Sequence, residues 1–187
     1  MAKEVFTIVE RCMACKACEI ACAVEHSAAK TLFGALLESP RSRPRVRVQR
    51  AMAFSYPARC MHCEDAPCIL ACPTGAMQRH PVTDSVFVDE DRCIGCWMCV
   101  MVCPFGAVTA DPTYKRALKC DRCPERVEAG REPACVEACP THALVFASPE
   151  EMAAMRREPI AQQVAAAVTA TEGLSTVRLW RSLRSSA

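Results

Sequence analysis

The sequence is short of several features that would place it in a common class of protein. Of its 187 residues only 5% are aromatic and 6 are glycine, and its formal net charge at pH 7 is +2. Proteins that bind nucleic acids usually have a strongly basic surface, so this small net charge argues against a nucleic-acid partner. No stretch approaches the roughly 18 uninterrupted apolar residues of a membrane span. We therefore expect a soluble protein with no direct membrane span.

The first ten residues, MAKEVFTIVE, lack the pattern of a secretion signal. They contain no apolar core and no pair of arginines. Secretion signals lead to compartments in which disulfides form, whereas thiols stay reduced in the cytoplasm. We expect a cytoplasmic location, and we do not expect a disulfide framework.

Cysteine is the residue that the sequence has in excess. All 16 cysteines fall in four runs, and each run ends in the spacing C-x3-C. The third run, in the segment RCIGCWMCVMVCPFGAV, has the spacing C-x2-C-x2-C-x3-C followed by proline. Proline also follows the second and fourth runs, whereas Ala23 follows the first. The runs are Cys12, Cys15, Cys18, Cys22; Cys60, Cys63, Cys68, Cys72; Cys93, Cys96, Cys99, Cys103; and Cys120, Cys123, Cys135, Cys139.

The spacing of the runs distinguishes between zinc and iron-sulfur sites. A structural zinc site pairs two C-x2-C knuckles around one ion, and it has no use for a C-x2-C-x2-C triple or a trailing C-x3-C-P. In bacterial ferredoxins three closely spaced cysteines hold one cluster, and the fourth ligates the other cluster of the unit. The sequence therefore predicts four 4Fe-4S clusters. Since each has four sulfurs, we expect no ligand among the isolated histidines, His26, His62, His80 and His142.

Because fourth cysteines are exchanged, the four runs must work in pairs. The link between the second and third runs, residues 73–92, is shorter than that between the first and second, residues 23–59. This favours pairing the second run with the third, so that the first pairs with the fourth around them. The predicted ligand sets are Cys12, Cys15, Cys18 and Cys139 (cluster 1); Cys60, Cys63, Cys68 and Cys103 (cluster 2); Cys93, Cys96, Cys99 and Cys72 (cluster 3); and Cys120, Cys123, Cys135 and Cys22 (cluster 4).

The expected fold class is α+β, with two nested two-cluster ferredoxin-like modules and a helical C-terminal extension. Short β-rich runs at Val5–Val9 and Val86–Asp89 lead into cysteine loops. Short helical turns carry the third and fourth cysteines of a run, which lie four apart on one side of a helix. Gly75 and Gly106 supply tight turns. The tandem domain is predicted at residues 1–148, with an inner module at about 55–112 and an outer module at about 1–38 plus 113–148.

The arginine-rich stretch PRSRPRVRVQR, residues 40–50, has two interpretations. As a strand it would place Arg43, Arg45 and Arg47 on one face, and Pro44 would confine it to a sheet edge. It is then either a solvated edge that resists aggregation or a docking strip for an acidic partner. Neither interpretation is decided by the sequence.

The extension at residues 149–187 begins with helix signals. Ser148 is placed as an N-cap, Pro149 lies in the first turn, and acids follow. Further on, Leu179, Trp180 and Leu183 lie among arginines. This segment is either an amphipathic helix that clasps the core or a hook for another subunit.

Taken together, the cysteine runs resemble those of the four-cluster electron-transfer subunits of anaerobic oxidoreductases. That family is found beside molybdenum or tungsten enzymes, hydrogenases and carbon monoxide dehydrogenase. The resemblance covers about residues 3–148, and it implies the same nested pairing. Within the family, the segments CEIACAVEHSAAKTLFGALLE (residues 18–38) and RCMHCEDAPCILACPTGAM (residues 59–77) are most similar to the ferredoxin-like partner of carbon monoxide dehydrogenase. Subunits of tungsten aldehyde oxidoreductases, formate dehydrogenases and hydrogenases share nearly all of it.

The predicted function is that of a non-catalytic electron-transfer subunit. Irons ligated only by cysteine leave no open position for a substrate, unlike a catalytic metal. The resemblance implies carbon monoxide dehydrogenase as partner, with a hydrogenase or flavin oxidoreductase as second redox protein; the alternative is a tungsten or molybdenum aldehyde oxidoreductase, formate dehydrogenase or hydrogenase complex. A redox sensor or a structural scaffold would also bind clusters. However, four clusters exceed the needs of a switch, and no DNA-binding helix pattern is present.

Overall fold

The computed structural model describes residues 3–170 and residue 184. The chain divides into a unit at Ala2–Phe146 and a second unit formed chiefly by Ala147–Ala187. The two units are described separately. In the described part of the chain, no helix combines the length and the apolar character needed to cross a membrane.

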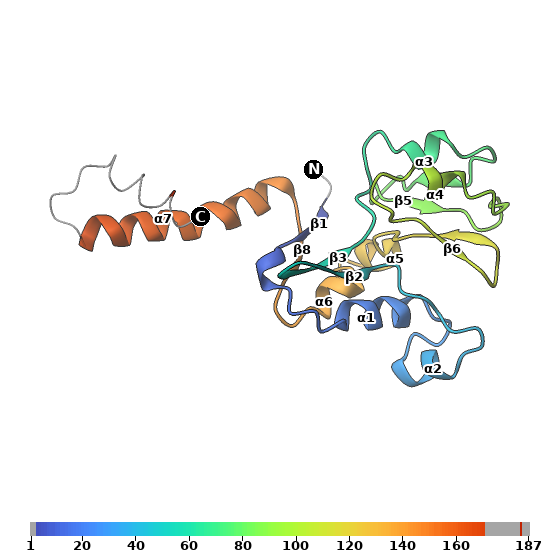
Figure 1. Ribbon diagram of the computed structural model, residues 1–187, viewed down its shortest axis with the longest axis horizontal. Helices are drawn as coiled ribbons and strands as arrows, with labels where there is room; N and C mark the ends of the chain where they lie inside the picture. Colours follow the sequence, from blue (N-terminus) through green and yellow to red (C-terminus); the bar gives the residue numbers. More distant parts are fainter. Residues whose placement is uncertain (1–2, 171–183, 185–187) are drawn as a thin grey trace. The chain divides into compact units, whose positions relative to one another are not determined.

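The first unit combines short helices with two-stranded sheets, as expected for the α+β class (Figure 1). The pairs β2–β3, β4–β5 and β6–β7 are antiparallel. The sheets pair β1 (Glu4–Thr7) with β8 (Leu144–Ala147), β2 (Arg47–Ala51) with β3 (Phe54–Ala58), β4 (Met77–Arg79) with β5 (Val86–Val88), and β6 (Thr109–Asp111) with β7 (Arg116–Leu118). The helices are the 3-10 turn η1 (Val9–Arg11), α1 (Ala17–Glu25), α2 (Leu32–Leu37), α3 (Pro67–Leu70), α4 (Met98–Val102), α5 (Pro124–Glu128) and α6 (Ala134–Glu137).

Two hydrophobic cores lie inside this unit, and each contains cysteines. One core joins residues of β1, α1, α6 and β8, and among them are Cys18, Cys22 and Cys135. The other joins residues of α3, α4, β4, β5 and β7, and among them are Cys68 and Cys99. Figure 1 shows α1 beside α6 and α3 beside α4, in agreement with these two groups. The first and fourth cysteine runs therefore share one core, and the second and third share the other.

Several local predictions from the sequence are confirmed. Gly75 and Gly106 have φ of 64° and 57°, so the tight turns after the two C-P dipeptides use the left-handed region that favours glycine. The predicted helical turns form as α1 and α4. The strand predicted at Val86–Asp89 forms as β5, one residue shorter. The strand predicted at Val5–Val9 is shifted, because the chain turns into η1 after Thr7.

The arginine-rich stretch is only partly a strand. β2 begins at Arg47, so Arg43 and Arg45 precede it and do not share a strand face with it. Its single sheet neighbour is β3, which makes it an edge strand as expected. The apolar side of the stretch packs inward, with Val46 only 1% exposed in the core of α1 and α6.

The second unit contains α7 (Pro149–Ala170). The Glu151 N–H donates to the Ser148 hydroxyl at 3.2 Å, and the Ser148 N–H donates to the Glu151 carboxylate at 2.7 Å. This reciprocal pair is a capping box, which satisfies two N–H groups at the helix start. The helix predicted at the start of the extension is therefore confirmed. The prediction for Leu179, Trp180 and Leu183 falls outside the described residues.

Candidate metal centres

All sixteen cysteines are free thiols, and cysteines from the first and fourth runs meet. Burial raises the pKa of Cys120 and Cys123 to about 12, and the negative charges of Asp121 and Cys22 raise it as well. Burial also raises the pKa of Cys135 well above its usual value, together with its neighbours Cys120, Cys22 and Cys123. The sulfur of Cys22 thus lies within electrostatic reach of three cysteines that follow it by about a hundred residues in the sequence.

The other end of the same core brings Cys18 near Cys139. Burial raises the pKa of Cys18 to about 11, and the negative charges of Glu19, Cys139 and Cys15 raise it as well. Cys22 therefore acts on the first three cysteines of the fourth run, and Cys139 acts on Cys18 of the first run. These are the neighbours that an exchanged ligand requires.

The second and third runs meet in the other core. Burial raises the pKa of Cys68, and the charges of Cys60 and Cys103 add to this effect. Burial raises the pKa of Cys99 to about 11, together with Cys93 and Cys96. Four cysteines also line one cavity: Cys72, Cys93, Cys96 and Cys99.

The chemistry of these donors fits an iron-sulfur cluster. The thiols whose pKa burial raises are neutral near pH 7 unless a positive charge compensates them; they are Cys18, Cys68, Cys99, Cys120, Cys123 and Cys135. A metal core supplies that charge and displaces the thiol protons, because it binds sulfur as thiolate. Crowding four thiols, which is unfavourable for the metal-free protein, thus becomes an arrangement suited to a cationic core.

The backbone of the loops fits as well. On either side of Cys15, Ala14 and Lys16 have φ of 59° and 61°; on either side of Cys96, Gly95 and Trp97 have φ of 68° and 64°. Alternating left-handed residues turn successive N–H groups inward and form a concavity that binds anions, including iron-sulfur clusters. For residues other than glycine such a conformation costs on the order of 1–3 kcal/mol, so it persists only where something holds it.

Hydrogen bonds also reach the cysteine sulfurs. The hydroxyls of Thr74 and Thr141 lie 3.7 and 3.8 Å from Cys72 and Cys139. Burial raises the pKa of Cys72, but bonds from the Met77 N–H and from Thr74 outweigh it, and the net pKa is lowered. Donors that stabilise a thiolate also tune a cluster that it ligates. The N–H groups that donate to sulfur are Arg45 to Cys22 (3.2 Å), His62 to Cys60 (3.3 Å), Ala107 to Cys103 (3.4 Å) and Ala117 to Cys93 (3.5 Å).

Exposure divides the cysteines into three groups, of which the half-buried group comprises Cys12, Cys63, Cys72, Cys93, Cys103, Cys120 and Cys139. Cys15 and Cys96 are exposed, and the loops around them carry the exposed apolar side chains Met13 and Ile94. The buried cysteines are Cys18, Cys22, Cys60, Cys68, Cys99, Cys123 and Cys135. Cys15 belongs to predicted cluster 1 and Cys96 to predicted cluster 3, and clusters 2 and 4 contain no exposed cysteine.

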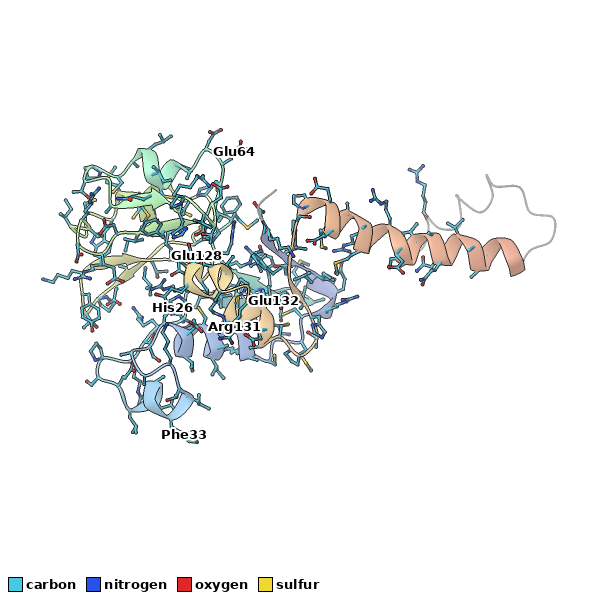
Figure 2. All side chains as sticks on the ribbon, turned by 180° about the vertical axis from the view of Figure 1, so that it is seen from behind. His26, Phe33, Glu64, Glu128, Arg131 and Glu132 are labelled. Atoms are coloured by element: carbon cyan, nitrogen blue, oxygen red, sulfur yellow. The ribbon has the colours of Figure 1, made fainter. Side chains whose placement is uncertain are left out.

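The histidines are less isolated than the sequence suggested. His26 (Figure 2) places Nε2 3.2 Å from Oδ1 of Asp121 and donates Nδ1 to the Cys22 carbonyl at 2.7 Å. Burial lowers the pKa of His26, but bonds to Asp121 and Cys22 outweigh it and raise the pKa to about 10. Arg45 forms a close ion pair with the same carboxylate. Donor atoms of His26, Asp121 and Cys123 lie within 4.8 Å of one another, but Asp121 is already satisfied by its two cations.

This network excludes both interpretations of the arginine-rich stretch at Arg45. Arg45 is not part of a solvated edge or an open docking strip, because its guanidinium is paired with Asp121 and its N–H faces Cys22. Arg43 donates to the Ala110 carbonyl at 3.4 Å. Arg43 is nevertheless exposed, as are Arg41, Arg47 and Arg50.

Sequence analysis missed two features of this unit. Arg59, Lys119 and Arg122 are buried basic residues. The short helix α2 exposes apolar side chains: Phe33 is 78% exposed and Leu37 is 86% exposed, and Figure 2 shows Phe33 at the outer end of the α2 segment. The largely apolar segment LFGALL (residues 32–37) is the sequence signal that indicates α2. A basic residue next to cysteine is not by itself a signal of burial.

Comparison with known proteins agrees with this chemistry. Residues 51–149 match the 4Fe-4S dicluster domain, and residues 9–25 match a 4Fe-4S binding domain. An iron-sulfur protein of Rhodospirillum rubrum is 39% identical over 168 residues, covering 83% of this chain and 87% of that protein. A protein of Escherichia coli K12 named as an electron transport protein, YsaA, is 40% identical over 154 residues, covering 80% and 94%. A subunit of the anaerobic dimethyl sulfoxide reductase of the same strain is 39% identical over 147 residues, covering 76% and 71%.

Proposed function

Because the protein belongs to the 4Fe-4S dicluster-domain family of iron-sulfur proteins, we propose that it is an electron-transfer subunit of an oxidoreductase complex and has no catalytic site of its own. Its relatives named as an electron transport protein and as a component of a reductase support this role. When bound, 4Fe-4S clusters supply reversible one-electron transfer at potentials set by the surrounding protein. The protein's own residues ligate the clusters, exclude water and adjust those potentials.

The proposal includes four clusters in nested pairs. Cluster 1 is held by Cys12, Cys15, Cys18 and Cys139, and cluster 4 by Cys120, Cys123, Cys135 and Cys22. Cluster 2 is held by Cys60, Cys63, Cys68 and Cys103, and cluster 3 by Cys93, Cys96, Cys99 and Cys72. The nesting is supported by packing: Cys18 and Cys22 of the first run lie in one core with Cys135 of the fourth, and Cys68 and Cys99 of the second and third runs lie in the other.

The two exposed cysteines define where electrons enter and leave. Cys15 and Cys96 bring clusters 1 and 3 to the surface, and each is surrounded by apolar side chains that a partner could cover. The proposed ligands of clusters 2 and 4 are all buried or half-buried, which limits the access of water to these two clusters. Electrons would then pass between a redox centre of the catalytic subunit and a second redox protein through this subunit.

For the catalytic partner we propose carbon monoxide dehydrogenase, with a hydrogenase or a flavin oxidoreductase as second partner. This rests on the resemblance of residues 18–38 and 59–77 to the ferredoxin-like partner of that enzyme. A second candidate is a subunit of an aldehyde oxidoreductase, formate dehydrogenase or hydrogenase complex. The relative that is a subunit of a dimethyl sulfoxide reductase favours this broader class of reductase.

The ligand exchange provides the sharpest test of the four-cluster assignment. Four clusters of four irons imply about 16 irons per molecule after anaerobic reconstitution. We expect Cys22→Ser to change the electron paramagnetic resonance signal of the cluster held by Cys120, Cys123 and Cys135. Cys139→Ser, its matched control, should change the signal of the cluster held by Cys12, Cys15 and Cys18. To distinguish ligand exchange from ligation within one run, each substitution is repeated in a protein that also carries Cys123→Ser.

In that background the fourth-run cluster is already altered, so Cys22→Ser should add no further change, whereas Cys139→Ser should add its full effect. Independent, additive effects of Cys22→Ser and Cys123→Ser would contradict the exchange. A zinc content above that of iron, or an iron count near half the expected value in the unmodified protein, would overturn the cluster assignment itself.

A further inference from the structure

A basic residue precedes the first cysteine of every run, and these four residues differ in their surroundings. They are Arg11, Arg59, Arg92 and Lys119. Arg11 and Arg92 are exposed to solvent. Arg59 is only 7% exposed and Lys119 only 2%. The buried pair precedes the runs that hold clusters 2 and 4, and the exposed pair precedes the runs that hold clusters 1 and 3.

The buried pair has hydrogen bonds but no acidic partner. Arg59 donates Nη1 to the Cys60 carbonyl at 3.1 Å, and its Nε is buried without a hydrogen-bond partner. Lys119 donates Nζ to the Cys120 carbonyl at 2.7 Å and closely to the Val86 carbonyl. Among residues 3–170, neither cation forms an ion pair with a carboxylate. Burial of a charge is costly unless an opposite charge lies nearby, so these cations require a negative charge that the side chains do not provide.

The two buried cations follow neighbouring parts of the backbone. Ala58, which precedes Arg59, and Leu118, which precedes Lys119, line the same cavity. Lys119 also reaches the carbonyl of Val86, which lies in the core of the second and third runs. The two cations therefore lie at the boundary between the modules.

A buried histidine marks the same boundary. His62 is 5% exposed, and its Nδ1 accepts the Val86 N–H at 2.9 Å. Its Nε2 is buried without a hydrogen-bond partner, and an imidazole ring carries no negative charge that could balance Arg59 and Lys119.

We propose that Arg59 and Lys119 raise the reduction potentials of clusters 2 and 4, each acting on the cluster of its own run and on that of the opposite module. The inference rests on the four-cluster assignment proposed above. Reduction adds one electron to a cluster, which comes from a reduced metal or flavin centre of the partner oxidoreductase, and no bond forms or breaks. A cluster with four thiolates is an anion, and a fixed neighbouring cation favours its more negative reduced form. These two residues act through charge and are not ligands.

Because Arg59 and Lys119 are buried and Arg11 and Arg92 are exposed, the reduction potentials of the clusters are raised unequally. Charges in water are screened, so Arg11 and Arg92 have little influence on clusters 1 and 3. Charges excluded from water act more strongly over the same distance. Electrons are therefore held preferentially at clusters 2 and 4, which contain no exposed cysteine, while clusters 1 and 3 have lower potentials.

Redox titration followed by electron paramagnetic resonance tests this inference on the fully loaded protein. Arg59→Gln and Lys119→Gln remove the charge but keep a donor for the carbonyl. We expect each variant to lower the midpoint potential of at least one cluster by ~59 mV or more. This shift corresponds to about tenfold in the one-electron equilibrium constant. The matched variants Arg11→Gln and Arg92→Gln make the same change at exposed positions, and they should cause less than a third of this shift.

The charge-retaining variants Arg59→Lys and Lys119→Arg complete the experiment. They should load the same iron as the unmodified protein and keep its potentials. Equal shifts from buried and exposed positions, or no shift from the buried ones, would overturn the inference. If the Gln variants lose iron, the iron content of the charge-retaining variants distinguishes charge from shape. A full iron content in these variants supports the role of charge. Loss of iron from them as well shows that the positions require a particular side-chain shape, and it overturns the inference. Iron content and four signals in the unmodified protein report separately on the four-cluster assignment.

Discussion

Asp121 holds together the surroundings of Cys22, and its conversion to asparagine should weaken one cluster selectively. Its carboxylate lies between two cations: Nε2 of His26 at 3.2 Å and the guanidinium of Arg45, which is closer. It also accepts the Cys123 N–H at 2.9 Å. Asp121→Asn preserves the shape and one acceptor, but it removes the negative charge that faces both cations.

The magnitude follows from the burial of the group. The side chain of Asp121 is 18% exposed, and the side chains of His26 and Arg45 are 13% and 17% exposed. Breaking a buried ion pair by removing one partner costs about 3–5 kcal/mol, because the other charge stays buried and uncompensated. We take the lower end, about 3 kcal/mol, since asparagine retains a hydrogen bond. This is equivalent to about a hundredfold in the population of the locally opened state.

Iron release to an excess of chelator under anaerobic conditions measures that population. When opening and closing are fast, attack on the open state follows its equilibrium population, so release from one cluster should accelerate about a hundredfold while the other three are unaffected. Asp84→Asn is the matched control: Asp84 pairs with Arg79 at 3.2 Å, but its side chain is 59% exposed, and exposed pairs contribute only about 0–1 kcal/mol. Equal acceleration in the two variants, or uniform loss of all clusters in Asp121→Asn, would refute the reasoning.

Two further predictions concern the cysteines and the partner. In the metal-free protein, iodoacetamide should alkylate the exposed Cys15 and Cys96 first and the buried Cys135 last, because burial raises the pKa of Cys135 and restricts access; peptide mass spectrometry gives the order, and rapid labelling of Cys135 would contradict it. Carbon monoxide dehydrogenase supplied with carbon monoxide should reduce this protein rapidly in a spectrophotometric assay, more slowly in added salt if the exposed Arg47 and Arg50 assist docking. Reduction by an aldehyde oxidoreductase or formate dehydrogenase instead would favour the second candidate.

The features that the sequence predicted correctly depend on local spacing. The turns at Gly75 and Gly106, the helical segments α1 and α4, and the capping box at Ser148 each involve residues a few positions apart. Over so few positions, the conformational preferences and hydrogen bonds of neighbouring residues determine the backbone geometry. The iron-sulfur chemistry was predictable for the same reason, since three ligands of a cluster lie close together in the sequence.

The features that the sequence did not predict depend on contacts between distant residues. Arg45 and Asp121 are 76 positions apart, so nothing near either residue indicates their pairing. Burial of Arg59 and Lys119 could not be expected either, because basic side chains are almost never fully buried unless they are paired. Within the described residues no acidic side chain is their partner, and on our proposal the negative charge of the clusters takes that place.

The proposed nesting explains why these two basic residues, and not the other two, are buried. An inserted module requires the backbone to cross the boundary twice, once on entry and once on return. β3 ends at Ala58 on the first crossing and β7 ends at Leu118 on the second, and both residues line the same cavity. Arg59 and Lys119 are the next residues in the sequence. One cation therefore lies at the boundary at each of the two places where the backbone crosses it. Arg11 ends η1 near the N-terminus and Arg92 lies within the inner module, and both are exposed to water.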